Sequence, residues 1–317
     1  MLSSNCRFIV VILVNIMLLS SCYIKSAKAP VVKTLVIASD FLSEEDTVLF
    51  ADFSKKYGVR LEIRPMTADA IIGLMRNTDY NSGLDLILSE SSHSAFRLSN
   101  EGLLQNIDPE DKEFDLEHNF VSDKYSYVAL GIDPFVIQYA PDSLVNARTY
   151  KDLFTIPHYH ALNRDDILVF LSPLRHEKNQ VEAYNWVENW NGVSQELTDS
   201  DSLVDSLHAT LIRYSHLAAD QIDKGTTYFP KGLKKGIYYD VITMAIVKQA
   251  ENYVTARLFI QHYSNPGNNS DINDKLGTFP LFDYLPARQG AFQLSPLSNE
   301  TLLQYHLMIE RILNKLE

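Results

Sequence analysis

The chain has 317 residues, of which 46% are hydrophobic and 21% are charged, and this is the balance of an ordinary globular protein. Asp and Glu number 40 against 28 Lys and Arg, so the formal net charge is −12, which argues against nucleic acid and anionic lipid surfaces as partners. At about 150 residues per domain, the length allows two domains or one large one.

The first 22 residues have the pattern of a secretory signal. An apolar run over residues 8–19 ends in Leu19-Ser20-Ser21-Cys22. The pattern resembles a bacterial lipoprotein signal, which implies cleavage before Cys22, a lipid on its thiol and a membrane-anchored place in the cell envelope, facing the periplasm or the exterior. A membrane-spanning helix is one alternative, but a span needs about 20 apolar residues. A signal peptide without lipidation is the other, because Arg7 is the only basic side chain before the run.

Cysteine usage restricts the chemistry of the mature chain. Cys6 and Cys22 are the only cysteines; the first leaves with residues 1–21 and the second would carry the lipid. We therefore expect no disulfide and no cysteine metal ligand in the mature fold. Loss of Arg7 with the signal makes the net charge −13.

The first part of the mature chain predicts alternating strands and helices. Residues 22–33 are interpreted as a tether, with order beginning at Thr34. Ser43 with Asp46 fits a capping box, and Thr67 is a second helix cap. The predicted strands are 34–38, 59–63 and 84–88, and the predicted helices are 43–57, 67–75 and 94–101. Such an order predicts a parallel sheet with covering helices.

The remaining elements are predicted from the same periodicities. Pro134 is expected to interrupt a strand over 127–139. Further strands are predicted at 167–171 and 238–247, helices at 181–190, 202–219, 252–263 and 299–316, a turn-rich break at 225–236 and a polar loop at 266–275.

Several short segments, taken in order, resemble bacterial ABC-importer solute-binding proteins. They are FADFSKKYGV (50–59), LSNEGLLQNID (98–108), the apolar strand at 129–139, TYKDLF (149–154), residues 240–266, and YLPAR (284–288), the last of which is similar to carbohydrate-type members. The resemblance covers most of residues 34–292. Residues 158–225 depart from it, because they lack the usual glycine-rich segments.

The resemblance implies an α/β, two-lobe periplasmic-binding-protein-like fold of type II, in which each lobe is a mainly parallel sheet flanked by helices and a hinge links the lobes. Lobe 1 would contain 34–135 and about 240–285, and lobe 2 would contain 136–239 and about 286–317. The implied function is capture of a small solute by a monomer and delivery to an ABC permease, with closure by hinge motion and no cofactor.

Candidate ligand-binding residues lie where predicted parallel strands end. Ser39 and Asp40 follow the first strand, and Glu90 and Ser91 follow the third. Ligands in such sheets bind beyond the carboxyl ends of the strands, so these side chains are expected to bond to a ligand. Helix capping and loop solvation are the alternative roles.

Aromatic candidates are Tyr127, Tyr228, Tyr238 and Tyr239, whose rings suit stacking on a sugar or a cation. Core packing is the alternative for each. Paired tyrosines bind ferric ion in some members of the family, but Tyr238 and Tyr239 fall in the returning strand. His158 and His160, near Asp165 and Asp166, are a weak metal pattern, and no metal site is predicted.

Catalytic signatures are absent from the sequence. It contains no G-x-S-x-G, no H-E-x-x-H and no G-x-G-x-x-G, so neither an enzyme nor a nucleotide-binding protein is predicted. Carbohydrate is the first choice of ligand, and a polyamine, a thiamine-like cation or ferric ion follows. Two rival classes remain: an envelope lipoprotein that uses the same fold as a sensor or protein-partner binder, and an envelope hydrolase.

Overall fold

The structure, a computed structural model, describes residues 33–78, 82–107, 121–122, 126–139, 147, 149–196, 209–217, 226–230, 236–281 and 299–316. The chain divides into two compact units, Met1–Lys33 and Thr34–Glu317, and every helix and strand below belongs to the second unit. The predicted signal, Cys22 and the tether up to residue 32 lie outside the described residues. Within the described ranges, no helix has the length and hydropathy needed to cross a membrane.

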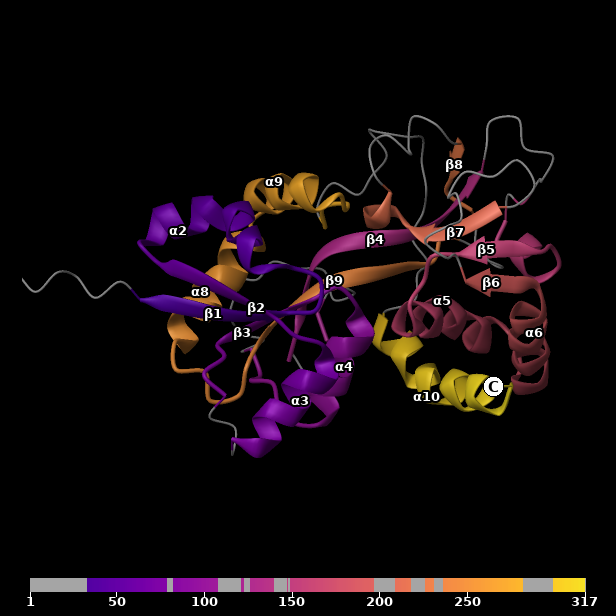
Figure 1. Ribbon diagram of the computed structural model, residues 1–317, viewed down its shortest axis with the longest axis horizontal. Helices are drawn as coiled ribbons and strands as arrows, with labels where there is room; N and C mark the ends of the chain where they lie inside the picture. The colour runs from indigo at the N-terminus through magenta and orange to yellow at the C-terminus, as the bar shows by residue number, and fades with distance from the viewer. Residues whose placement is uncertain are drawn as a thin grey trace, which may run out of the picture. The chain divides into compact units, whose positions relative to one another are not determined.

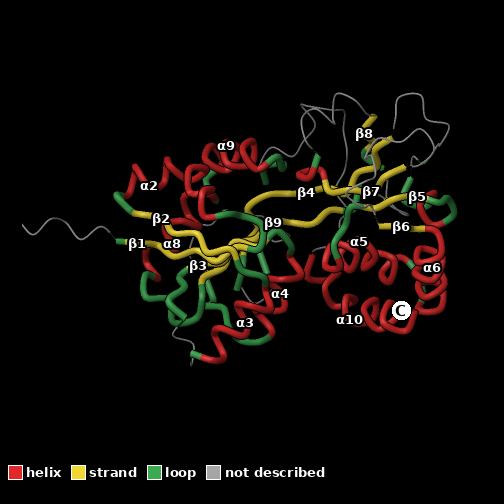
Figure 2. The backbone as a smooth tube through the Cα atoms, viewed as in Figure 1, coloured by secondary structure: helices red, strands yellow, loops and turns green. Residues whose placement is uncertain are grey.

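The first half of the sheet is parallel and is covered on both faces (Figures 1 and 2). Strand β1 (Thr34–Ser39) lies between β2 (Arg60–Pro65) and β3 (Leu86–Ser89). Helices α2 (Ala51–Tyr57) and α8 (Tyr253–Tyr263) pack on one face, and α3 (Ala68–Asn77) and α4 (Ser92–Asn100) pack on the other. The predicted strands and helices of this region are confirmed.

The predicted helix caps of this half are also confirmed. Ser43 donates from its backbone N and its Oγ to Asp46 Oδ2, each at 2.7 Å, and starts the 3-10 helix η1 (Glu44–Phe50) that leads into α2. Thr67 Oγ1 accepts from the backbone N of Ala70 at 3.3 Å at the start of α3. Gly58 ends α2 with a φ of 63°, a left-handed value that glycine adopts without strain.

The second half has its own parallel strands and core. Strand β5 (His158–His160) pairs with β6 (Ser194–Glu196) and with β7 (Ala209–Arg213). Helices α5 (Arg164–Glu177), α6 (Gln180–Val193) and α10 (Asn299–Leu316) pack with this half, as Figure 1 shows. Its core is aromatic, built around Tyr150, Phe170 and Trp190.

Two long antiparallel strands join the halves. Strands β4 (Val128–Tyr139) and β9 (Tyr239–Ile246) pair with each other, and the sheet order is β2-β1-β3-β9-β4-β7-β5-β6, with β8 (Thr226–Tyr228) also on β4. Val128 and Leu130 belong to the first core, whereas Phe135 and Ile137 belong to the second. Pro134 does not interrupt β4, because it pairs with Tyr239 within the strand.

Four predicted elements are wrong, and one of them is the turn-rich break at 225–236, whose described residues include strand β8 (Thr226–Tyr228). The apolar run 167–171 lies inside helix α5, since a short buried run does not distinguish a strand from a helix by itself. Of the predicted helix 202–219, the described part is strand β7 followed by the 3-10 helix η4 (Tyr214–His216). The predicted polar loop 266–275 is helix α9 (Pro266–Leu276), which Asn265 caps by accepting from the backbone N of Gly267.

Helix α9 is held against β4 by buried asparagines. Asn269 Nδ2 and Asn273 Nδ2 both donate to the carbonyl of Leu130, at 2.8 Å and 2.9 Å, where the register of β4 shifts. Asn273 Oδ1 accepts from Thr278 Oγ1 at 2.5 Å. Only a glycine fits at position 131, because a Cβ there would lie 1.8 Å from Asn273 Oδ1.

Candidate functional site

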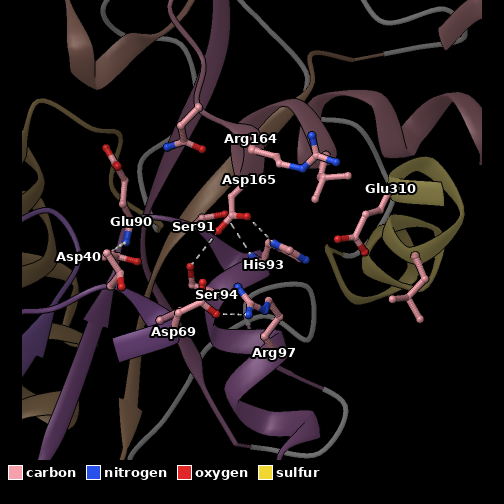
Figure 3. A pocket seen from close by; sticks show the side chains of 15 residues that line it. Asp40, Asp69, Glu90, Ser91, His93, Ser94, Arg97, Arg164, Asp165 and Glu310 are labelled. Carbon is pink, nitrogen blue, oxygen red and sulfur yellow. Dashed lines mark hydrogen bonds and ion pairs between the residues drawn. The ribbon is translucent and has the colours of Figure 1, made fainter. Parts of the chain in front are cut away.

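A cavity of about 610 Å³ lies where β1 and β3 end, against α4, α5 and α10. The residues that line it are Asp40, Thr67, Ala68, Asp69, Glu90, Ser91, His93, Ser94, Arg97, Asn163, Arg164, Asp165, Leu168, Leu307 and Glu310. Figure 3 shows Asp40 and Glu90 on one side of this pocket and Glu310 on the opposite side. Three of the predicted site residues, Asp40, Glu90 and Ser91, are therefore brought together here.

The two strand ends are tied to each other through Asp40. Its Oδ2 accepts from Ser89 Oγ at 2.6 Å, and its Oδ1 accepts from the backbone N of Glu90 at 2.8 Å. Burial raises the pKa of Asp40 more than these hydrogen bonds lower it. Ser39, the fourth predicted residue at the strand ends, is buried and does not line the pocket: its Oγ accepts from the backbone N of Leu42 at 3.2 Å and so supports the turn after β1.

The turn between β3 and α4, residues 89–92, is anchored by Asp240 of β9. Ser91 Oγ donates to Asp240 Oδ2 at 2.8 Å, and the backbone N and Oγ of Ser92 donate to Asp240 Oδ1 at 3.0 Å and 2.5 Å. Ser91 Oγ also accepts from the backbone N of His93, so it caps α4. Ser91 therefore caps α4, which was the alternative role considered for it, and also lines the pocket.

A fully buried arginine at the end of β7 connects four elements. Arg213 Nε donates to Asp133 Oδ2 of β4 at 2.7 Å, and Arg213 Nη1 donates to Asp166 Oδ1 of α5 at 2.9 Å. Arg213 Nη1 also lies 3.9 Å from Asp240 Oδ2, and Nη2 donates to the carbonyl of Glu90 at 2.8 Å. One guanidinium therefore faces three buried carboxyl groups.

The excess of buried carboxyl groups around Arg213 shifts their protonation. Burial raises the pKa of Asp166 to about 6 against the opposing charge of Arg213, and Asp240 and Glu90 add to the rise. Burial likewise raises the pKa of Asp240, although Arg213, Ser92 and Ser91 oppose it. The cluster consequently takes up protons in mildly acidic solution.

Glu90 also pairs with a histidine from the second half. His216 Nε2 lies 2.5 Å from Glu90 Oε1. Burial raises the pKa of Glu90, but the hydrogen bond from His216 and the charges of Arg213 and His216 outweigh it, so the pKa of Glu90 is lowered. Burial lowers the pKa of His216, but the hydrogen bond and charge of Glu90 outweigh it, so the pKa of His216 is raised.

A second histidine–carboxylate pair is formed by two residues that line the pocket. His93 Nδ1 of α4 is 3.0 Å from Asp165 Oδ1 of α5, and Ser94 Oγ donates to Asp165 at 3.3 Å. Burial raises the pKa of Asp165, but the hydrogen bonds from His93 and Ser94 and the charges of His93 and Arg97 give a net lowering. Arg97 itself pairs with Asp69, beside it in the pocket lining (Figure 3).

The four predicted tyrosines do not line this pocket. Tyr238 is buried and stacks on Tyr150 with ring centroids 4.6 Å apart, and Tyr239 is buried in the cluster between the halves. Tyr127 belongs to the core under α3 and α4. Tyr228 is half-buried and stacks on Tyr139 at 5.6 Å. Core packing, the alternative considered for each, describes their placement.

No group of three or more His, Cys, Asp or Glu side chains in the described part of the chain is arranged to hold a metal ion. His158 and His160 are buried, and both rings pack on Trp190, with centroids 4.7 Å and 5.7 Å away. Burial lowers the pKa of His158 to about 4, so the ring is neutral at pH 7. These two histidines belong to the core of the second half.

The charge of the pocket favours a cation. Its lining contains five carboxylates, those of Asp40, Asp69, Glu90, Asp165 and Glu310, against the guanidinium groups of Arg97 and Arg164. Clefts lined by one sign of charge concentrate counter-ions from solution. Among the described residues of the lining, none is a Phe, Tyr or Trp on which a sugar would stack.

Solved structures with the same architecture exist. The ferric binding protein from Campylobacter jejuni aligns with a TM-score of 0.76 and 14% identity, over 89% of this chain and 99% of that one. The chain has the fold of the type II periplasmic binding proteins. Trichodesmium IdiA (FutA), solved in complex with iron and citrate, aligns with a TM-score of 0.75 and 15% identity, over 89% of this chain and 99% of that one. No protein-family model and no curated protein matches the sequence.

Sequence reasoning did not select most of the residues that line the pocket, among them Asp69, Asp165 and Glu310. It also missed four residues of the charged cluster beside the pocket: Asp133, Arg213, His216 and Asp240. Three of them carry a recognisable signal, because Asp133, Arg213 and Asp240 are charged residues inside or at the end of apolar strand patterns. Charged side chains in such positions are almost never buried without a partner. His216 has no such signal in the sequence.

Proposed function

We propose that this protein is the solute-binding component of an ABC importer and captures a small cation in the pocket between β1, β3, α4, α5 and α10. The observation that carries the proposal is the cavity of about 610 Å³ whose lining contains five carboxylates, two of which, those of Asp40 and Glu90, follow the carboxyl ends of β1 and β3. The fold supports it, because the similar structures are described as ferric-ion-binding proteins. Binding rather than catalysis is the activity proposed.

The two lobes are proposed as residues 34–135 with about 240–285, and residues 136–239 with about 286–317. The distribution of the cores supports this division, since the core around Phe53 and the core around Trp190 lie on opposite sides of the pocket-forming segments. Strands β4 and β9 cross between the cores and would serve as the hinge. Motion about them would open and close access to the pocket beside α4 and α5, which are already in contact here through His93 and Asp165.

The cargo is proposed to be cationic, and carbohydrate, favoured from the sequence, becomes the weaker candidate. The charge of the lining supports this order, as does the absence of Phe, Tyr and Trp among its described residues. Ferric iron is the first cation to test, because the similar structures are described with iron. A polyamine and a thiamine-like cation follow, since the cavity is large enough for an organic molecule.

The signal pattern supports a place in the cell envelope. We propose that the lipid on Cys22 holds the protein at the membrane beside its permease, where tethering raises its effective concentration. Incorporation of labelled palmitate into the wild-type chain, and its loss in Cys22→Ser, would test the anchor.

Binding is tested by isothermal titration of the chain from Tyr23, which keeps the whole compact unit Thr34–Glu317. The ligands are ferric citrate, spermidine, thiamine and maltose, with citrate alone as a control. We expect one of the cations to bind and Glu310→Gln to weaken it by about tenfold, because this carboxylate lines the pocket at the side opposite Asp40.

Glu188→Gln is the matched control, because Glu188 is an exposed carboxylate of α6 that does not line the pocket. It should bind as the wild type does. Binding of maltose with no cation, or an equal effect of the two substitutions, would contradict the proposal.

A further inference from the structure

The turn between β3 and α4 is attached to the second half by contacts that converge on Glu90. Arg213 Nη2 donates to the carbonyl of Glu90 at 2.8 Å, and His216 Nε2 lies 2.5 Å from its carboxylate. Both basic residues come from the end of β7 and the turn after it. Two basic side chains of one half therefore contact the backbone and the side chain of a single pocket residue of the other half.

We infer that Arg213, His216 and Glu90 form a proton-dependent latch that holds the two halves of the molecule closed over the pocket. This inference goes beyond the proposed binding function, because the latch acts in the protein without a solute. It assigns to His216 and Arg213 a role in positioning the pocket wall.

The two basic residues contribute differently to the latch. Arginine stays protonated at every physiological pH, so the contact of Arg213 with the Glu90 carbonyl is independent of pH. Arg213 also donates to Asp133 and Asp166 and lies beside Asp240, and these contacts hold its side chain in place. Histidine changes charge near neutrality, so the contact of His216 with the Glu90 carboxylate is the part of the latch that responds to pH.

The groups that face His216 determine the direction of the response. Glu90 faces it from the β3–α4 turn, Asp133 from β4 and Arg213 from β7, and the two carboxylates favour its protonated form. Since the closed arrangement raises the pKa of His216, its contribution to closure is complete below the ordinary histidine pKa of about 6.5. The contribution begins to fall above that value and is lost as the pH rises through the raised pKa of His216 in the closed arrangement.

Two other ionisable side chains, Asp166 and His93, lie at the same boundary. Asp166, whose pKa is about 6, faces Arg213, Asp240, Glu90 and His216, and its protonation changes mainly below the range in which His216 loses its proton. His93 of α4 pairs with Asp165 of α5 and faces His306 of α10. Its share of the response is measured separately with His93→Gln.

The latch is tested by single-molecule fluorescence transfer without any ligand. The chain from Tyr23 has no cysteine, so dyes are attached at Lys55→Cys on α2 and Asn189→Cys on α6, both of which are exposed. We expect the closed population to be larger at about pH 6 than at about pH 8. The closing equilibrium should change by about fivefold, the lower end of typical coupling between sites.

His216→Gln should remove most of this change, because glutamine keeps a hydrogen-bond donor but does not titrate. His262→Gln is the matched control: His262 Nε2 lies 2.7 Å from Asp52 Oδ2, but this pair joins α8 to α2 within one half. It should leave the pH response intact. Glu90→Gln provides a second variant and should also reduce the response.

A wild-type protein whose closed population is the same at both pH values would overturn the latch. So would a folded His216→Gln variant that keeps the full response, or a His262→Gln variant that loses it. Circular dichroism establishes that each variant is folded. Because no solute is present, a failed latch and a failed cation titration are separate results.

Discussion

Replacement of Gly131 by alanine tests how helix α9 is seated on the strand that crosses between the halves. An ideal Cβ at this position would lie 1.8 Å from Asn273 Oδ1, 2.9 Å from Asn273 Cγ and 3.0 Å from Thr278 Oγ1. Because atoms do not approach so closely, the buried side chain of Asn273 must move. Movement breaks its bonds to the carbonyls of Leu130 and Asn269 and to Thr278 Oγ1.

The expected cost follows from those three hydrogen bonds. At about 1 kcal/mol for each, their loss lowers the free energy of unfolding by about 3 kcal/mol. Alanine returns about 0.5–1 kcal/mol, because glycine is unfavourable inside a strand. The net loss of about 2–2.5 kcal/mol should lower the thermal midpoint by about 4–10 °C.

Urea unfolding of Gly131→Ala, Asn273→Ala and the double variant measures the effect as a double-mutant cycle. Asn273→Ala removes the same bonds and also the atom with which the Cβ collides. The double variant should therefore be about as stable as Asn273→Ala alone, and the two effects should be strongly non-additive. Gly73→Ala is the control, because this glycine lies in α3 with no atom within 4 Å of the added Cβ. It should be neutral or stabilising by up to about 1 kcal/mol.

Additive effects of the two substitutions would refute the reasoning, because they would show that the Cβ at 131 and the side chain at 273 do not compete for one space. A Gly131→Ala protein that is as stable as Gly73→Ala would refute it as well.

Two further predictions concern buried charge. Arg213→Met leaves Asp133, Asp166 and Asp240 buried without their counter-charge, so we expect a loss of about 3–5 kcal/mol at pH 7, measured by urea unfolding. The loss should be smaller at about pH 5, because the raised pKa values of Asp166 and Asp240 favour their neutral forms; an equal loss at both pH values would contradict this. His158, with its pKa lowered to about 4 by burial, resists protonation, so its contribution is complete above about pH 6.5 and is lost as the pH falls towards 4. Between pH 7 and pH 4, the free energy of unfolding of His158→Phe should fall by up to about 3 kcal/mol less than that of the wild type. If the two proteins lose stability equally over this range, His158 is not a cause of the acid sensitivity.

Local patterns in the sequence predicted much of the fold. The capping box at Ser43 and Asp46, the strand at Thr34–Ser39 and the striped helix at Asn299–Leu316 depend on neighbours a few residues away, and each was predicted from the sequence. The sequence also predicted that Asp40 and Glu90 lie at one site, because each follows a parallel strand and parallel strands bring their carboxyl ends together.

Helix α9 and strand β7 could not be predicted in this way. Residues 266–275 contain Pro, Gly and Asn, which are typical of loops, and they form a helix because Asn269 and Asn273 bond to the bulged strand β4. Residues 209–213 form a strand because they lie between β4 and β5 in the sheet. In both places partners distant in sequence outweigh the local propensity.

The sequence by itself determined the class of the fold, the secretory signal pattern and the strand ends at which a ligand would bind, because these follow from periodicity and short motifs. The tertiary structure alone decided that the predicted tyrosines pack in cores and that Arg213 joins Asp133, 80 residues away, to Asp166 and the Glu90 carbonyl. The physical reason is that a charge is stable in a dry interior only beside its partners, and those partners are chosen by the packing of elements far apart in the chain.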